Sequence, residues 1–189
     1  MRWPRPLLLI AATALVAGCG DRHLVLKVDV LSYIDPSLTQ VAFGPVPSVP
    51  GGLYTGEQEV VKDVEVNMVD GTNSVAEVKD VSIAMTAVAS DSTGAGADTL
   101  RLYVSDLTVD PLSTPPAVVL PLALEPGVTD TVRVDLGTDS RVADLFTGRR
   151  MRLTLTTALR GPDTGQELNA RIQITAIDAV LVAGRKSGL

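Results

Sequence analysis

The side chains on which most enzymes rely are scarce in this sequence. Its 189 residues include one histidine and one cysteine, and aromatic residues make up 3% of the chain. A Ser-His-Asp or Cys-His mechanism needs a histidine held rigidly against a nucleophile, but His23 lies in a short polar stretch. A zinc site needs a cluster of thiolate or imidazole ligands. We therefore expect no catalytic residue, no metal and no cofactor, and a protein that is not an enzyme.

Other absences limit the architectures that the chain can adopt. A single cysteine, Cys19, excludes an intramolecular disulfide, so the fold depends on its apolar core and on backbone pairing. The apolar run at residues 7–16 is about ten residues long, whereas a helix that spans a bilayer needs roughly 20. No glycine-rich phosphate loop joins a strand to a helix.

The segment at positions 1–18 has the order of charge and hydropathy that is typical of a secretory signal peptide. Arg2 and Arg5 precede the apolar run, and Ala17-Gly18 follow it directly before Cys19. The segment LVAGC at residues 15–19 resembles the lipobox of bacterial lipoprotein precursors. The resemblance implies a diacylglycerol thioether on Cys19 and cleavage between Gly18 and Cys19. The competing interpretations are an ordinary signal peptide with a chance cysteine, and a structural cysteine in an unprocessed chain.

The residue after the acylated cysteine carries a sorting signal in proteobacterial lipoproteins, where aspartate retains the protein in the inner membrane. Here that residue is Gly20, and Asp21 follows one position later. The resemblance therefore predicts a lipid-anchored protein of the cell envelope, attached to the outer membrane and facing the periplasm.

Charge limits the partners of the mature chain. Without the segment 1–18, 14 basic side chains face 22 acidic ones, a net charge of −8 if the amino group is acylated. This charge argues against nucleic acid, and against anionic lipid surfaces, as partners of the domain as a whole. The expected partners are the membrane, through the N-terminal lipid, and an envelope protein.

Period-2 alternation of apolar residues dominates the chain from Leu24 onwards and indicates strands with one buried face. We predict an all-β fold: an antiparallel β-sandwich, immunoglobulin-like in general architecture, of about seven to nine strands with one short helix. A polar tether at residues 19–23 would precede a single domain at residues 24–189. The helix is expected at residues 139–147, and the phase of alternation shifts at Ile177, which suggests either a bulge or burial on both faces near Val180 to Val182.

Three turn-forming segments are interpreted as hairpin connections. These are Asp70-Gly71-Thr72-Asn73, the loop at residues 91–98, and the sequence Gly161-Pro162-Asp163-Thr164-Gly165. In the last of these hairpins, Met151, Leu153 and Leu155 would face inward, and Thr154 would face outward.

Residues 35–56 interrupt the strand pattern with four prolines and several glycines. A structureless segment of this length is unusual in a compact domain. Phe43 and Tyr54 lie within it, either as rings that cover one end of the core or as an exposed surface for a partner. An alternative function follows, a solute or carbohydrate binding module whose site is formed by loops 35–56 and 91–98.

Arg149, Arg150 and Arg152 form a basic cluster at the start of a predicted strand. They could bind lipid phosphates or an acidic partner, or they could be charges that protect a sheet edge from aggregation.

Two further possibilities involve carboxylates. Loop oxygens at Asp70–Asn73, at Asp91 with Asp98, and at Asp106 with Asp110 could bind calcium, although tight turns require the same residues. A hydrolase that uses two carboxylates across a cleft is a third, weaker hypothesis.

Overall fold

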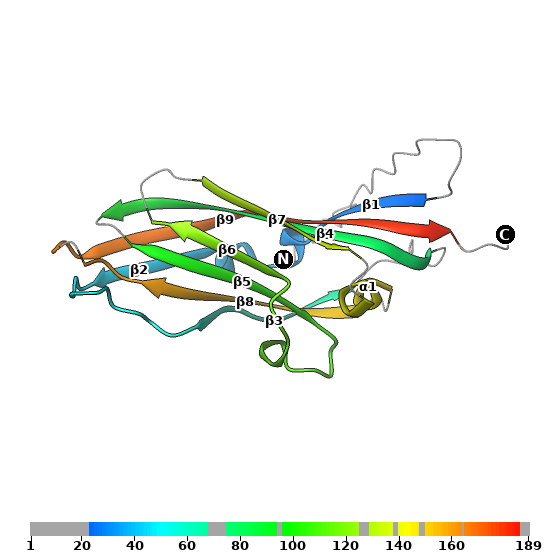
Figure 1. The fold of residues 1–189 in the computed structure, drawn as a ribbon, viewed down its shortest axis with the longest axis horizontal. Coiled ribbons are helices and arrows are strands. Elements are labelled where there is room, and N and C mark those ends of the chain that lie inside the picture. The colour runs from blue at the N-terminus through cyan, green and yellow to red at the C-terminus, as the bar shows by residue number, and fades with distance from the viewer. Residues whose placement is uncertain are drawn as a thin grey trace, which may run out of the picture.

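The described part of the chain is a sandwich of two antiparallel sheets (Figure 1). The computed structural model describes residues 23–67, 75–93, 96–124, 129–137, 140–147, 150–163 and 165–185. Within these ranges one sheet has five strands and the other has four, which lies in the predicted range. The all-β sandwich predicted from the alternation is therefore confirmed.

The five-stranded sheet, called the long sheet below, is built around the C-terminal strand. Its order is β1-β9-β4-β7, and β2 also pairs with β9. β1 covers one end of β9 and β2 covers the other, so the two short strands share one side of a single long strand. The bounds are β1 His23–Asp29, β2 Gln40–Val46, β4 Val75–Thr93, β7 Thr129–Gly137 and β9 Leu168–Arg185.

The four-stranded sheet, called the short sheet, has the order β3-β8-β5-β6. β6 lies at its edge, as Pro121 predicts, because proline cannot donate to a neighbouring strand. The bounds are β3 Gln58–Asn67, β5 Ala97–Ser105, β6 Val118–Ala123 and β8 Arg150–Arg160.

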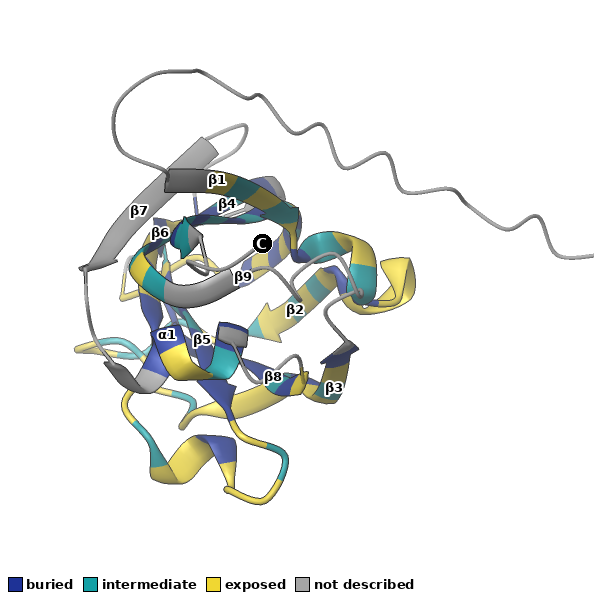
Figure 2. Cartoon of the chain, turned by 90° about the vertical axis from the view of Figure 1, so that its right-hand side faces the viewer, coloured by how far each residue is buried: buried dark blue, intermediate teal, exposed yellow. Residues whose placement is uncertain are grey.

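The core lies between the sheets and consists mostly of aliphatic side chains. Strands of both sheets contribute alternate residues, for example Ile83 and Met85 from β4 and Leu100 and Leu102 from β5. The helix α1, Ser140–Thr147, confirms the predicted helix. Its buried Phe146 is part of the core. Because α1 contacts β4 of the long sheet and β5 and β8 of the short sheet, it closes one end of the sandwich (Figure 2).

The interpretation of three segments as hairpins is wrong. β3 and β8 belong to the short sheet, β4 and β9 to the long sheet, and β5 to the short sheet, so each of these connections crosses between the sheets. Alternation identifies the buried face of a strand but not its partner. Sheets are about 10 Å apart and neighbouring strands about 4.8 Å apart, and a short turn spans either distance. Residues 68–74, 94–95 and 164 lie outside the described residues.

The segment at residues 35–56 is not structureless, contrary to expectation. It contains a 3-10 turn, Pro36–Leu38, and the strand β2, whose register shifts between Phe43 and Val46. Prolines are tolerated there because β2 forms part of a sheet border and Pro45 falls in the shift. The following residues, 47–57, cross from β2 in the long sheet to β3 in the short sheet, and we call them the strap.

The predicted bulge in β9 is confirmed. Ala176 lies opposite Thr86, but Ile174 lies opposite Ala87, so Thr175 is an extra residue on β9. The buried row consequently changes from Ile172 and Ile174 to Ile177 and the alternate residues that follow.

Candidate functional site

The outer face of the short sheet is polar but largely covered. Tyr103 of β5 and Thr154 and Thr156 of β8 are all buried, although their neighbours in register place them on the side away from the core. The connection between β5 and β6 lies on this face, because its 3-10 turn at Pro111–Ser113 contacts both β5 and β8 and lines a pocket with Thr154. The prediction that Thr154 faces outward is correct, but the segment folded over it keeps it from solvent.

A bulge in β3 forms the second wall. The register with β8 shifts between Val61 and Val64, and Asp63 adopts a φ of 53°. Aspartate tolerates this left-handed conformation better than most residues. The Asp63 N–H donates to Thr154 Oγ1 at 3.3 Å, and its Oδ1 lies 3.6 Å from Arg152 Nε. Contacts with β8 therefore hold a strained residue in place.

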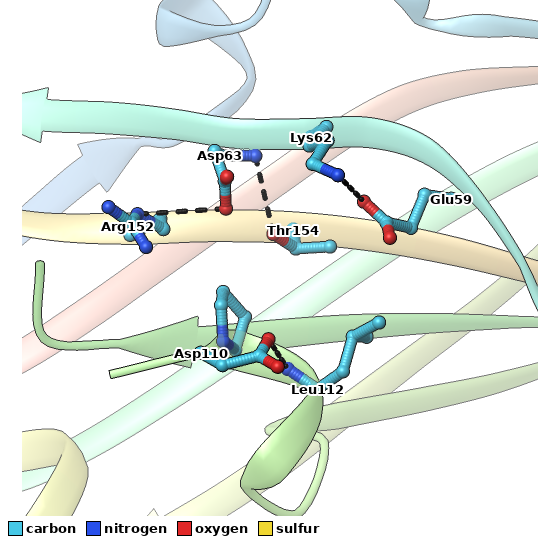
Figure 3. Close-up of a pocket in the computed structure, with 8 residues that line it drawn as sticks. Glu59, Lys62, Asp63, Asp110, Leu112, Arg152 and Thr154 are labelled. Atoms are coloured by element: carbon cyan, nitrogen blue, oxygen red, sulfur yellow. Dashed lines mark hydrogen bonds and ion pairs between the residues drawn. The ribbon is translucent and has the colours of Figure 1, made fainter. Parts of the chain in front are cut away.

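Between the bulge and the 3-10 turn lies a pocket of about 290 Å³ (Figure 3). Its charged groups are engaged with one another or with the backbone. Lys62 Nζ is 3.4 Å from Glu59 Oε2, and Asp110 accepts from the Leu112 N–H at 3.0 Å. The lining consists of Glu59, Lys62, Asp63, Asp110, Pro111, Leu112, Arg152 and Thr154.

A hydrogen-bonded network centred on Glu57 lies on the same face. Glu57 Oε1 accepts from the Tyr103 hydroxyl at 2.7 Å and from the Thr156 hydroxyl, and Arg101 Nη1 is 3.9 Å away. Burial raises the pKa of Glu57, but the two hydroxyl donors and the charge of Arg101 outweigh it, so the pKa is lowered overall. Burial and the bond to Glu57 raise the pKa of Tyr103.

A second pocket, of about 410 Å³, lies between α1 and the start of the β5–β6 connection. Its charged groups are again tied locally. The Arg150 guanidinium donates to Glu65 across the β3–β8 pair, and Asp106 accepts from both the N–H and the hydroxyl of Thr108. The lining is Asp106, Leu107, Thr108, Asp144, Leu145 and Arg150.

The structure separates the residues that the sequence singled out. Phe43 is half-buried against the core, whereas Tyr54 is 64% exposed on the strap beside Arg160. Arg150 and Arg152 line different pockets, and each is paired with an acidic residue of β3. Arg149, Gly18 and Cys19 lie outside the described residues.

The candidate calcium ligands do not form a shared site in the part of the chain that the structure describes. Asp98 is an interior residue, 2% exposed, with its Oδ2 accepting from the Thr157 hydroxyl at 2.6 Å. Asp106 and Asp110 accept hydrogen bonds within their own turns. Among the described residues no group of three or more His, Cys, Asp or Glu side chains could hold a metal ion. Asp70 and its turn lie outside those residues.

Sequence reasoning missed Glu57, Glu59, Lys62, Asp63 and Tyr103. One signal was available: the alternation fails in Val60-Val61-Lys62-Asp63-Val64, where three valines cannot all keep one phase. Such a break marks a bulge. Nothing local could indicate that residues 106–117 fold back over the opposite side of the same sheet.

Fold and site together define a β-sandwich with a polar pocket on one outer face. No protein-family model and no curated protein sequence match the chain. Solved structures that resemble it include the infectious bursal disease virus Gx strain (13% identity, TM-score 0.41) and Gt strain (12%, 0.39). Each match covers 98% of this chain, which spans only 39% and 43% of the respective viral chains.

None of the helices in the described ranges is both long enough and apolar enough to cross a bilayer.

Proposed function

We propose that this protein is a lipid-anchored β-sandwich of the bacterial cell envelope that acts by binding or assembly rather than by catalysis. The observation that carries the proposal is the LVAGC segment at residues 15–19, placed directly after an apolar run of signal-peptide length. The anchor holds the sandwich at the membrane, and the expected location is the outer membrane, facing the periplasm.

The charged groups of the pockets support a non-enzymatic role. A carboxylate general acid needs a raised pKa close to the reacting bond. The pKa of Asp98 is raised by burial, but this carboxyl faces the core, opposite Leu122 and Leu159 in register. In the pocket, Glu59 and Asp63 are paired with cations, which is the arrangement of a structural surface.

The alternative of a solute or carbohydrate binding module has less support. Neither of the two pockets described above is lined by residues 35–56 or 91–98. The strap is instead hydrogen-bonded to the β8–β9 connection, for example from the Gly161 N–H to the Leu53 carbonyl at 2.7 Å.

Metabolic labelling with palmitate tests the anchor. The wild-type protein is expected to incorporate palmitate and to fractionate with membranes, whereas Cys19→Ala should lose both properties. A Cys19→Ala protein that is cleaved normally and stays in the membrane fraction would contradict the proposal. The variant Gly20→Asp tests sorting, because it should move an acylated protein from the outer to the inner membrane without changing palmitate incorporation.

A further inference from the structure

The first described residue lies at one end of the long sheet. His23 of β1 is opposite Gly184 of β9, and Val75, where β4 begins, is opposite Arg185. The starts of β1 and β4 and the end of β9 therefore meet at one end of the sandwich (Figure 1), which we call the anchor end. Cys19 lies only four positions before His23, and a tether of that length spans at most about 14 Å when fully extended.

The strap lies at the opposite end. β2, which leads into it, ends with Val46 opposite Leu168, and β4 ends with Thr93 opposite Asn169. β4 runs from one end to the other in 19 residues. At roughly 3.3 Å per residue, the two ends are about 60 Å apart.

We infer that the sandwich stands end-on at the membrane, with its anchor end against the lipid surface and the strap at the far end of the body. The inference rests on the proposed lipid anchor. The tether is several times shorter than the body, and it is attached at an end of that body rather than at its middle. The anchor end is therefore confined to the bilayer surface, and the strap end is free to extend from it.

Charge favours this orientation over one in which the sandwich lies flat. The mature chain has a net charge of −8, and envelope membranes that contain anionic lipids repel a broad acidic surface. An end-on contact presents the smallest area of the elongated body to the headgroups. At the anchor end, Val25 is 52% exposed and Lys79 of β4 is exposed, and the neighbouring Asp80 is the more buried of the two charged residues.

Hydrogen bonds fix the strap to the β8–β9 connection at the end of the sandwich opposite the anchor end. The Val49 N–H donates to the Pro162 carbonyl at 3.2 Å, and the Gly165 N–H donates to Ser48 Oγ at 2.8 Å. Tyr54, at 64% exposure, points from this fixed frame into solvent. The surface that the strap presents is thus the part of the domain farthest from the lipid.

Single-cysteine labelling of the full, processed protein tests the orientation. A thioether consumes the Cys19 thiol, so an introduced cysteine is the one site for a maleimide donor dye. Labels at Val25→Cys and Lys79→Cys report on the anchor end, and labels at Tyr54→Cys and Gln166→Cys report on the strap end. All four side chains are exposed, and each end has two variants in case one fails to fold.

Energy transfer to a headgroup-linked acceptor is measured after insertion into vesicles of phosphatidylethanolamine and phosphatidylglycerol. Transfer from the two anchor-end labels should exceed that from the two strap-end labels several-fold. Equal transfer from both ends, or stronger transfer from the strap, would overturn the end-on orientation. A different result contradicts the lipid anchor itself: maleimide labelling of the wild-type protein, or its recovery in the soluble fraction.

Discussion

Asp98 is a titratable group inside an apolar core, and its ionisation should be visible in the stability of the protein. Burial raises its pKa above the usual 3.8, against the opposing effect of the Thr157 hydroxyl, and its Oδ1 has no hydrogen-bond partner among the described residues. The folded protein therefore binds this proton more tightly than the unfolded chain. The stability contributed by protonated Asp98 is present below pH 3.8 and is lost as the pH rises through the folded-state pKa.

The variant Asp98→Asn should remove this loss, because the amide keeps an oxygen for Thr157 and carries no charge. We expect its free energy of unfolding, measured by urea denaturation, to fall less than that of the wild type as the pH rises from 3.8 to 7. Asp163→Asn makes the same change at an exposed position and serves as the matched control. If the free energy of unfolding of Asp98→Asn changed with pH as steeply as that of the wild type, a group other than Asp98 would be responsible for the pH dependence between 3.8 and 7.

The Tyr103 hydroxyl should contribute through its bond to Glu57. Tyr103→Phe leaves the ring in place and removes one donor to a carboxylate, which should cost about 1 kcal/mol near neutral pH. Glu57 has a lowered folded-state pKa, so its contribution is present above its usual pKa of 4.5 and is lost as the pH falls through the folded value. The cost of Tyr103→Phe, measured by urea denaturation, should therefore shrink in acid. Tyr54→Phe, at an exposed ring, serves as the control for the substitution and should be neutral.

Among the elements, the β3 bulge depends on one residue in the left-handed region. Asp63→Ala should destabilise the protein by about 1–2 kcal/mol, because alanine adopts a φ near 53° at a cost. Asp63→Asn should cost less, since asparagine tolerates this conformation. Both variants lose the carboxylate that faces Arg152, so chemical denaturation of the pair separates backbone strain from charge. Equal losses in the free energy of unfolding would mean that the ion pair with Arg152, and not the left-handed conformation, accounts for the contribution of Asp63.

The strap offers a second matched pair, at two adjacent glycines. Gly51 and Gly52 have φ values of 82° and 75°, so alanine is strained at either position. A Cβ on Gly52 would lie 2.7 Å from the Gly161 carbonyl oxygen, whereas one on Gly51 meets no described atom within 4 Å. Thermal denaturation should show a larger loss for Gly52→Ala, by about 1–3 kcal/mol, and limited proteolysis should cut its strap faster. Similar losses would indicate that the strap does not rest on Gly161.

Patterns within one element were predictable from the sequence, and contacts between elements were not. Period-2 alternation located most of the strands and the β9 bulge, and the helical spacing of Val142, Leu145 and Phe146 located α1, because burial of one face leaves its period in the residue order. The three supposed hairpins failed because partner choice depends on the whole sheet. Pro45 hid β2, since a strand at a border with a register shift tolerates residues that exclude a central strand.

The candidate site follows the same division. Arg152 was identified from a charge cluster in sequence, but its partner Asp63 lies far earlier in the chain, on β3. The Glu57 network joins β5 and β8 to the residue just before β3, and the pocket wall comes from a connection that leaves the sheet and returns. The Arg152–Asp63 pair, the Glu57 network and the pocket wall have no local sequence signature, because each depends on contacts between residues far apart in the chain.

At the scale of the whole molecule, β9 has a consequence for how the chain must fold. This strand pairs with β1, β2 and β4, so the first strand of the domain finds its partner only near the other end of the chain, with His23 opposite Gly184. Closing so long a loop makes folding slow compared with that of helical domains. A nascent chain that lacks the segment 168–185 cannot complete the long sheet, and delayed folding keeps a polypeptide extended. Under the proposed export, a chain whose central strand comes last in the sheet-forming sequence would cross the membrane with its long sheet incomplete until residues 168–185 have been made.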